Sequence, residues 1–456
     1  MGKRVRKRWI FHGEAGIGSG LLWRSITQAF AFFGRLYNRA FLMIPGVLHA
    51  HGVDFVWLAL LLVALAGSFT STIYLAMTLI ATVRHLRQAR EARAAAAATP
   101  LSSLPPVTIF KPVHGMEEQL AANLESFLGQ DYPDYEVIFG VRDRDNPAAK
   151  IAEETRARYP HIPSQLIVSG PPAWPNAKIF SLDKMIAVSA RSYFIISDSD
   201  VRVAPDFLRN TIPPLLDPKV GLITCMYRGI PAADFWSWLE ALGLSVEMSS
   251  GVMVADMVEG MRFALGPAMA VRRDAIDAIG GIGVVADYYA DDFELGNRIS
   301  AKGFKVVLSH HIVHNVLTHR SPLRTLGDQL RWMKSTRYSR PLGHAGTGLT
   351  YAMPFGILGL IAGAALGNWQ LGIGLFALAG LNRMIQSVVV GWGVARDPRA
   401  VWLCWLYPLR DLFGFIAWTL SYTSREFYWR GETYRFGKGG TIAPLDRPGV
   451  SASGPA

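Results

Sequence analysis

SYFIISDSDVRV, residues 192–203, is the stretch that decides the fold. Its apolar, β-branched half predicts a buried strand, and the strand ends in Asp198 and Asp200 with one residue between them. In an extended chain residues i and i+2 point the same way, so both carboxylates can converge on one hard divalent cation and the phosphate oxygens that it carries. The pattern predicts a Mg²⁺ or Mn²⁺ site for a diphosphate. The alternative is a solvated turn with helix-capping aspartates.

Three similar runs precede this stretch, and each is followed by a helix-like segment: VTIFKPV (107–113), YEVIFGVRD (135–143) and SQLIVSG (164–170). This alternation predicts an α/β domain over residues 105–343, with an open, Rossmann-like and mostly parallel sheet. In such sheets ligands bind at the carboxyl ends of the strands. Polar residues at these strand ends are therefore the first candidates for a site.

Three further motifs carry side chains suited to a phosphorylated ligand. Asp143 ends a strand and can accept hydrogen bonds from a ribose hydroxyl or a base N–H, although Asp143 also fits an ordinary turn. Asp291 and Asp292 begin a helical pattern, where they either cap the helix or supply a base for an acceptor hydroxyl. Arg331 beside Trp332 offers a bidentate phosphate contact and a flat platform for a ring, or belongs to a basic interfacial helix.

Composition points to a membrane protein. Of the 456 residues, 50% are hydrophobic and only 18% are charged, which is too apolar for an ordinary soluble enzyme. The net charge of +11 predicts an anionic partner, and in so apolar a chain an acidic membrane surface is favoured over nucleic acid. Cys225 and Cys404 lie far apart, which excludes a disulfide-stapled scaffold, a CxxC redox site and a cysteine-built zinc site.

Residues 55–83 carry no charge and predict a transmembrane helix. Four arginines follow within ten positions, whereas Arg39 alone lies close on the other side, so the positive-inside rule places the α/β domain in the cytoplasm. Two more spans are predicted at about 350–366 and 371–394. Because the next stretch, about 401–422, contains Arg410 and Asp411, it either lies at the membrane interface or faces a protein cavity; we favour two spans plus an interfacial helix.

The predicted organisation therefore has six segments. They are an N-terminal extension with an interfacial helix (1–54), a transmembrane helix (55–83), a basic Ala/Pro linker (84–104), the α/β domain (105–343), C-terminal transmembrane and interfacial helices (344–424) and a basic cytosolic tail (425–456). A native start at Met43 explains the N-terminal pattern equally well.

Taken in order, these motifs resemble inverting, family-2-type glycosyltransferases of the GT-A fold. More narrowly, the sequence resembles the ceramide glucosyltransferase family and its bacterial relatives that glycosylate hopanoids. The likeness runs from about residue 105 to 341, and its landmarks are VRDRDNPA, PNAKI, DSDVRV, GLITCMYRG, VRRDAIDAIGG and ADDFELG.

The resemblance implies roles for individual residues. They are Asp143 for the uridine of a UDP-sugar, Lys178 facing the nucleotide, Asp198 and Asp200 for the metal and diphosphate, Asp292 as catalytic base, and Arg331 with Trp332 for diphosphate and acceptor contacts. One position departs from the family motif, because Asp328 stands where Gln or Arg is usual. That departure argues against a processive polysaccharide synthase.

The expected activity is transfer of a sugar, most simply glucose, from a UDP-sugar to a lipid hydroxyl, most simply that of ceramide, with Mg²⁺ or Mn²⁺. The alternatives are transfer of N-acetylglucosamine or another sugar to a hopanoid polyol or diacylglycerol. A catalytically silent scaffold that binds lipid or nucleotide is a further alternative, against which the intact set of candidate residues speaks. Expected partners are the UDP-sugar, a membrane lipid and the bilayer, with no nucleic acid. The expected location is multi-pass in a membrane, the plasma or inner membrane if the source is bacterial.

Overall fold

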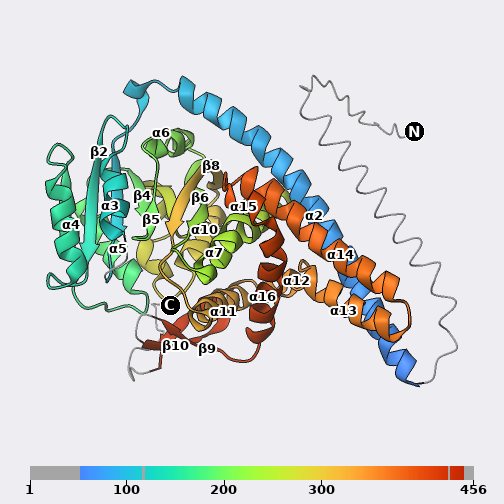
Figure 1. Cartoon of the computed structure of the whole chain (residues 1–456). Coiled ribbons are helices and arrows are strands. Elements are labelled where there is room, and N and C mark those ends of the chain that lie inside the picture. The colour runs from blue at the N-terminus through green and yellow to red at the C-terminus, as the bar shows by residue number, and fades with distance from the viewer. Residues whose placement is uncertain (1–51, 116–118, 430–431, 446–456) are drawn as a thin grey trace, which may run out of the picture.

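The computed structural model describes residues 52–115, 119–429 and 432–445 (Figure 1). The predicted N-terminal interfacial helix and Met43 lie outside these residues. An α/β domain occupies one side of the molecule, and a group of long helices extends from it on the other side.

The α/β domain is built on one eight-stranded sheet with the order β3-β2-β1-β4-β7-β6-β8-β5. The first four strands in this order pair in parallel, β6 and β8 also pair in parallel, and β7 and β5 run antiparallel to their neighbours. The predicted mostly parallel α/β sheet is confirmed. The strands are β1 Val107–Pro112, β2 Tyr135–Val141, β3 Ser164–Val168, β4 Tyr193–Ser197, β5 Val201–Arg202, β6 Val220–Ile230, β7 Ala268–Arg272 and β8 Lys305–Val316.

Strand β4 shows why these runs are apolar throughout. Phe194 and Ile196 pack into the core on one face of the sheet, and Ile195 packs into the core on the other face. Both faces are buried, so both sets of alternating side chains must be apolar. The helices of the domain are α3 Leu120–Leu128, α4 Pro147–Ala157, α5 Ala177–Val188, α6 Phe207–Thr211, α7 Phe235–Leu242, α8 Ser249–Glu259, α9 Arg273–Ala278, α10 Asp291–Ala301 and α11 Pro322–Ser339.

Helix α2, Gly52–Ala98, is 47 residues long and contains both the predicted transmembrane helix and most of the predicted linker (Figure 1). The prediction of a linker from residue 84 was therefore wrong as far as Ala98. Alanine is the best helix former, so the alanine run extends the helix instead of breaking it. At 1.5 Å per residue the helix is about 70 Å long, which exceeds the ~30 Å of a bilayer core. Its C-terminal part packs against β8 and α8 of the α/β domain.

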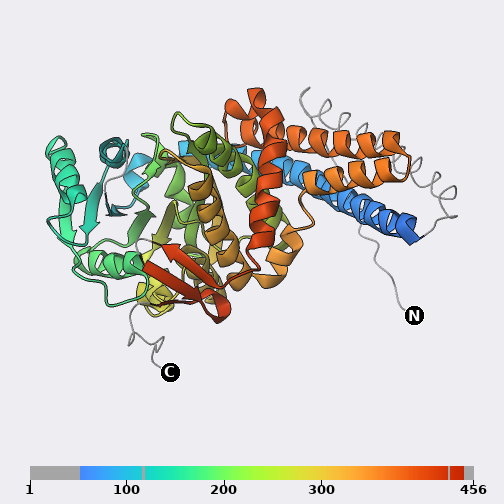
Figure 2. The same ribbon diagram turned by 60° about the horizontal axis from the view of Figure 1, so that its bottom comes forward.

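The C-terminal helices include the two stretches predicted as membrane spans, but only Trp369–Trp392 is long enough to cross a membrane, because Met353–Ala365 has 13 residues. Helices α13 and α14 pack against each other and against α2 (Figures 1 and 2). Within the described residues three helices are long and apolar enough to cross a membrane: Asp54–Ala98, Phe235–Glu259 and Trp369–Trp392. The second was not predicted from the sequence, and half of its apolar window is buried inside the protein. The C-terminal helices are α12 Pro341–Thr347, α13 Met353–Ala365, α14 Trp369–Gln386, α15 Arg399–Trp402 and α16 Tyr407–Leu420.

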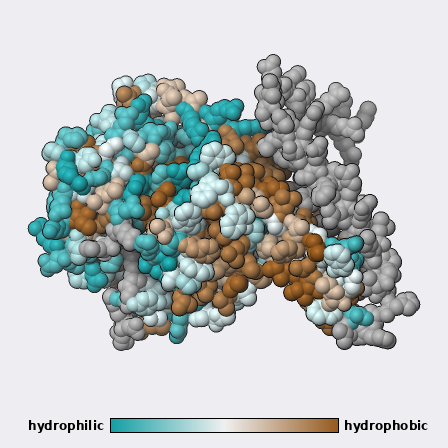
Figure 3. All heavy atoms as spheres, viewed as in Figure 1, coloured by the Kyte–Doolittle hydropathy of each residue, from teal (hydrophilic) through white to brown (hydrophobic). Residues whose placement is uncertain are grey.

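The charged pair Arg410 and Asp411 lies on α16 and faces protein, which is one of the two predicted alternatives. Asp411 pairs with Arg383 of α14 at 3.1 Å and accepts hydrogen bonds from the backbone N–H groups of Ala352 and Met353. Arg410 pairs with Glu247 at 3.0 Å. Figure 3 shows that hydrophobic residues cover this part of the molecule, whereas hydrophilic residues cover most of the α/β domain. The charges on α16 are thus satisfied internally.

The C-terminal segment is not the basic tail that the sequence predicts. It forms a second sheet of three antiparallel strands, β9 Glu426–Trp429, β10 Glu432–Phe436 and β11 Ile442–Pro444 (Figure 2). An aromatic and aliphatic cluster holds this sheet against Tyr289, and the Ile442 N–H donates to the Asp287 carbonyl at 2.8 Å. Arginines conceal this pattern in the sequence, because the buried aromatics alternate with charged residues.

Candidate active site

One large cavity, of about 1110 Å³, lies where the carboxyl ends of the central strands meet α8, α10 and α11. Most small-molecule sites have volumes of about 300–1,000 Å³, so this cavity has room for more than one ligand. Of the sequence-predicted residues, the structure brings seven to its wall: Lys178, Asp198, Asp200, Asp291, Asp292, Arg331 and Trp332.

Asp198 and Asp200 follow β4, but they lie in a turn and not in extended chain. The Val201 N–H closes this turn on the Asp198 carbonyl at 3.3 Å. The argument from strand alternation therefore does not apply to this pair, although both residues reach the cavity. Buried Lys111, at the end of β1, donates from Nζ to the Asp198 carbonyl and to Ser197 Oγ, which anchors the turn to the sheet.

Lys178 connects this turn to the start of α10. Asn176 caps α5 by accepting from the Lys178 N–H, and its amide donates to Asp291 Oδ1 at 3.1 Å. Lys178 Nζ lies 2.6 Å from Asp198 Oδ1 and 3.6 Å from Asp291 Oδ2. Burial alone would lower the pKa of the lysine, but the carboxylates of Asp198 and Asp291 outweigh burial and raise this pKa. Lys178 therefore stays charged and neutralises part of the acidic cluster.

The two adjacent aspartates of α10 have different surroundings. Asp291 is buried and contacts Asn176 and Lys178, so it does not cap the helix, which was the role expected for an aspartate that is not the base. Asp292 lines the cavity, and its Oδ1 accepts from the Phe293 N–H at 2.8 Å. Burial and then the negative charge of Asp291 raise the pKa of Asp292 from 3.8 to about 7. A carboxylate with this pKa is suited to take a proton near neutral pH.

Gly266 allows these carboxylates to approach one another. A Cβ atom at this position would lie 3.1 Å from Asp292 Oδ2 and 3.5 Å from Asp198 Oδ2. Any larger side chain would enter the space between the two acids. The sequence does not single out this glycine, because its role depends on residues that are distant along the chain.

Arg331 is held by the residue that departs from the family motif. Asp328 pairs with Arg331 at 3.0 Å and also with Arg320, which the sequence analysis missed. Arg320 and Arg331 both line the cavity, and Trp332 packs against Leu244 and Leu317. Asp328 thus fixes two guanidinium groups beside the acidic cluster, an arrangement suited to bind phosphate oxygens.

Asp143 is the predicted residue that the structure does not bring to the cavity. It is exposed after β2, whereas its neighbour Arg142 lines the cavity. Residues Ser169 and Gly170, which follow the adjacent strand β3, line the same region.

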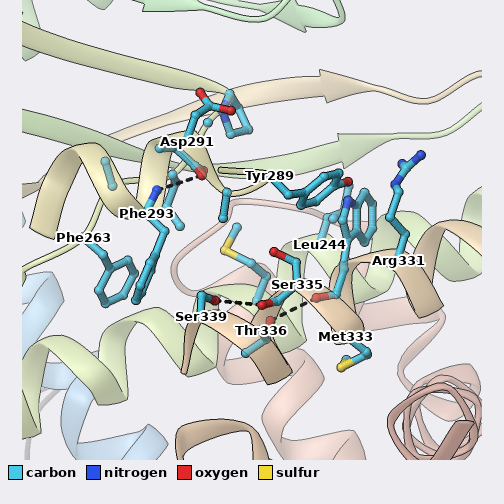
Figure 4. A pocket seen from close by; sticks show the side chains of 18 of the residues that line it. Leu244, Phe263, Tyr289, Asp291, Phe293, Arg331, Met333, Ser335, Thr336 and Ser339 are labelled. Atoms are coloured by element: carbon cyan, nitrogen blue, oxygen red, sulfur yellow. Dashed lines mark hydrogen bonds between the residues drawn. The ribbon is translucent and has the colours of Figure 1, made fainter. Parts of the chain in front are cut away.

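An apolar wall begins directly beside Asp292. The rings of Phe263 and Phe293 lie 5.6 Å apart on one side of the cavity, with Leu244 and Met333 on the other (Figure 4). Another part of the lining is formed by α2 and α8 with residues such as Ile73, Met77, Val254 and Val258. The same cavity therefore combines a charged end with an apolar end.

The C-terminal sheet contributes part of the cavity that the sequence did not reveal. Trp429, Glu432, Tyr434 and Pro444 line it next to Tyr289, and Tyr289 itself lies close to α10 (Figure 4). The alternation of aromatic and polar residues in EFYWRGETYRF, 426–436, is the signal that could have identified these strands.

The donor set at Asp198 and Asp200 fits a hard divalent cation that takes its remaining ligands from a diphosphate and water. Among residues 52–115, 119–429 and 432–445 there is no group of three or more His, Cys, Asp or Glu side chains placed to hold a metal ion. Two carboxylates are nevertheless sufficient for Mg²⁺, which is usually bound by one or two carboxylates together with substrate phosphates.

Several known proteins resemble this chain in sequence or in structure. The sequence model of glycosyl transferase family 21 matches residues 41–442. Ceramide glucosyltransferase 3 of Caenorhabditis elegans is 24% identical over 75% of each chain, and ceramide glucosyltransferase 1 of the same organism is 22% identical over 46% of each chain. Among solved structures, a mannosyltransferase of Pyrobaculum calidifontis in complex with GDP-mannose and Mn²⁺ is 16% identical, with a TM-score of 0.44, over 78% of this chain and 99% of the other.

Proposed function

The chain belongs to glycosyl transferase family 21, and from this premise we propose that it transfers glucose from UDP-glucose to a hydroxyl of ceramide at a membrane surface. The observation that carries the proposal is the single cavity that joins the acidic residues Asp198, Asp200 and Asp292 to the apolar surfaces of α2 and α8. A nucleotide sugar requires the first part, and a lipid acceptor requires the second. The names of the related glucosyltransferases support the choice of glucose and ceramide.

Donor binding is assigned to the charged end of the cavity. Asp198 and Asp200 would hold Mg²⁺ or Mn²⁺, which supplies charge neutralisation for the diphosphate when it is bound. Lys178 orients Asp198, and Arg331 and Arg320 contact phosphate oxygens. Trp332 offers a flat surface beside them. Asp143 is exposed beyond the cavity, so the cavity-lining Arg142 next to it is the nearer candidate for the nucleotide at this strand end.

The reaction is one direct displacement with inversion at the anomeric carbon. A bond forms between the lipid oxygen and this carbon while the bond from the carbon to the UDP oxygen breaks, and UDP leaves with the electron pair. Asp292 takes the proton from the lipid hydroxyl, for which its pKa of about 7 is suited. Arg331 and Arg320 offset the negative charge that develops on UDP.

The difference between the two aspartates supports the choice of Asp292 as base. Asp291 is occupied by Asn176 and Lys178, and its charge raises the pKa of its neighbour. Asp291 therefore acts as a positioning residue, and Asp292 faces the reacting atoms.

We place the α/β domain in the cytosol and the long helices in the membrane. Arg84 in the C-terminal half of α2 pairs with Asp256 of α8, so the basic stretch that follows the apolar part of α2 lies against the α/β domain. By the positive-inside rule this side is cytoplasmic. The mouth of the cavity then lies at the level of the lipid head groups.

The test is release of UDP from UDP-glucose by the purified protein in lipid-containing detergent, with and without ceramide and with Mg²⁺, Mn²⁺ or EDTA. We expect release that requires both ceramide and the metal, and mass spectrometry should identify glucosylceramide. Asp200→Ala should be inactive but folded. Activity in EDTA would overturn the metal assignment, transfer to a hopanoid polyol or diacylglycerol would change the acceptor, and absence of UDP release with every acceptor would favour the scaffold.

A further inference from the structure

The inner end of the cavity contains a carboxylate, Glu247, that the proposed reaction does not use. Glu247 lies on a π-helical turn, Gly243–Met248, that joins α7 to α8. This turn contacts a second π-helical turn, Ser387–Trp392, at the end of α14. Such turns are rare and occur frequently at functional sites, because they redirect a side chain that a regular helix would place elsewhere.

The partner of Glu247 is Arg410, a buried side chain that contacts protein groups through Nη2. Arg410 pairs with Glu247 Oε2 at 3.0 Å and donates to Gln329 Oε1 at 2.9 Å, and Gln329 in turn donates to Glu240. Only glycine at position 243 leaves space for this arginine, since a Cβ atom there would lie 2.3 Å from Arg410 Nε. The Arg410 side chain is 3% exposed.

Glu247 itself remains accessible. Its side chain is 25% exposed, and it lines the cavity together with apolar residues of α2 and α8. A pair whose only purpose is to hold two helices together would have both side chains enclosed, like Arg383 and Asp411, which are each 3% exposed. The remaining surface of Glu247 therefore faces the space that a ligand would occupy.

We infer that Glu247 is a specificity-determining residue that accepts a hydrogen bond from a second polar group of the lipid acceptor. This inference rests on the proposed function. A carboxylate in an apolar cavity requires a donor, and ceramide supplies two besides the attacked hydroxyl: its amide N–H and its secondary hydroxyl. Diacylglycerol supplies none, because its single hydroxyl must face Asp292. Glu247 thus selects lipids that carry a further donor near the attacked oxygen.

The first experiment needs no variant. Transfer by the wild-type protein is measured with ceramide, with 3-deoxyceramide, which lacks the secondary hydroxyl, and with the ester analogue in which oxygen replaces the amide N–H. Hydrogen bonds to charged groups contribute enough to predict a loss of about 10- to 100-fold in kcat/KM for at least one analogue. Equal kcat/KM values for all three lipids would overturn the inference.

The second experiment asks whether Glu247 is the group that senses the donor. In Glu247→Gln the loss on ceramide should be about 10-fold or more, the KM for UDP-glucose should stay unchanged, and the discrimination between ceramide and the sensitive analogue should largely disappear. If the effects of changing Glu247 and of changing the lipid do not add, the two groups contact each other directly. If the variant loses activity equally on all lipids, Glu247 acts only as a helix clamp and the inference is wrong.

The matched control is Asp256→Asn. Asp256 also belongs to α8 and also pairs with an arginine, Arg84, but it does not line the cavity. This variant should discriminate between ceramide and the analogues as the wild type does; lost discrimination would contradict the assignment of Glu247. If the wild type glucosylates none of the lipids, the proposed function fails, whereas transfer to ceramide without a role for Glu247 overturns this inference alone.

Discussion

Among the buried charges of the described residues, two clusters differ in balance. The carboxylate cluster contains Asp198, Asp291 and Asp292 around one lysine, Lys178. The helix cluster contains Arg383 and Arg410 opposite Asp411 and Glu247. In the helix cluster the charges cancel and join helices. In the carboxylate cluster acids outnumber bases, and burial followed by the charge of Asp291 raises the pKa of Asp292 to about 7. A cluster with excess negative charge raises the pKa of a carboxyl group, which suits that group to act as a base. A cluster whose charges cancel stabilises the packing of its helices.

The largest expected effect comes from removing the base of the carboxylate cluster. Asp292→Asn keeps the size of the side chain but cannot accept the proton, so kcat should fall by roughly 10² to 10⁴. UDP affinity should change little. Steady-state kinetics and isothermal titration of UDP provide the measurements.

The matched variant is Asp291→Asn, which removes a partner of Lys178 and weakens the bond from Asn176. It should reduce stability by about 1–3 kcal/mol and cost far less in kcat. If Asp291→Asn is the inactive variant and Asp292→Asn retains its turnover, the base has been assigned to the wrong residue.

In the helix cluster the expected effect is on stability and not on chemistry. Asp411→Asn leaves Arg383 buried without its counter-charge, which should reduce stability by about 3–5 kcal/mol. Thermal unfolding in detergent measures the loss. Glu154→Gln, at an exposed pair with Lys150, should be nearly neutral. A wild-type melting temperature for Asp411→Asn would show that charge pairing in the helix cluster does not stabilise the fold.

Substitution of Asp328 tests whether a residue outside the carboxylate cluster positions Arg320 and Arg331. Asp328→Asn removes the charge that holds Arg320 and Arg331, so kcat/KM for UDP-glucose should fall by about 10-fold, mainly through KM. UDP affinity should fall in parallel, in contrast to Asp292→Asn. Asp328→Glu should recover part of the loss. Unchanged UDP affinity in Asp328→Asn would remove Asp328 from the donor site.

The smallest expected effect is on pH dependence. The pKa of Asp292 is about 7 in the folded protein and near 3.9 in an unfolded chain, so the folded state favours the protonated acid. The stability that this proton contributes is complete below pH ~3.9 and is lost as pH rises through about 7. As the pH rises from 5.5 to 8.5, the melting temperature of Asp292→Asn should therefore increase relative to that of the wild type.

Catalysis should also depend on the protonation of Asp292, but activity should rise with pH whereas stability falls. Because the base must be deprotonated, wild-type kcat/KM should rise with pH up to about 7 and then level off. A pH–rate profile with no change between pH 5.5 and pH 8 would show that Asp292 does not limit the reaction.

Much of this architecture was predictable from local sequence. Apolar β-branched runs identified β1 to β4, long apolar runs located α2, α13 and α14, and the order of short motifs identified the family. These features depend on residues that are neighbours along the chain, and a periodic pattern records them directly. The C-terminal sheet was not predicted from the sequence, because charged residues dominate the composition of this segment.

Only the tertiary structure determined which partners each charged side chain has. Asp291 and Asp292 are adjacent and chemically identical and both border the cavity, yet Asn176, 115 positions away from Asp291, donates to the first, whereas the second accepts from the Phe293 N–H. In the same way, Arg320 explains why Asp328 stands in the motif, and the packing of α16 on α7 and α14 places Arg410 and Asp411 inside the protein. The physical reason is that the pKa and the partners of a buried charge depend on every group nearby in space. The sequence by itself therefore determined the strands, the apolar helices and the candidate residues, and the fold assigned a distinct environment to each.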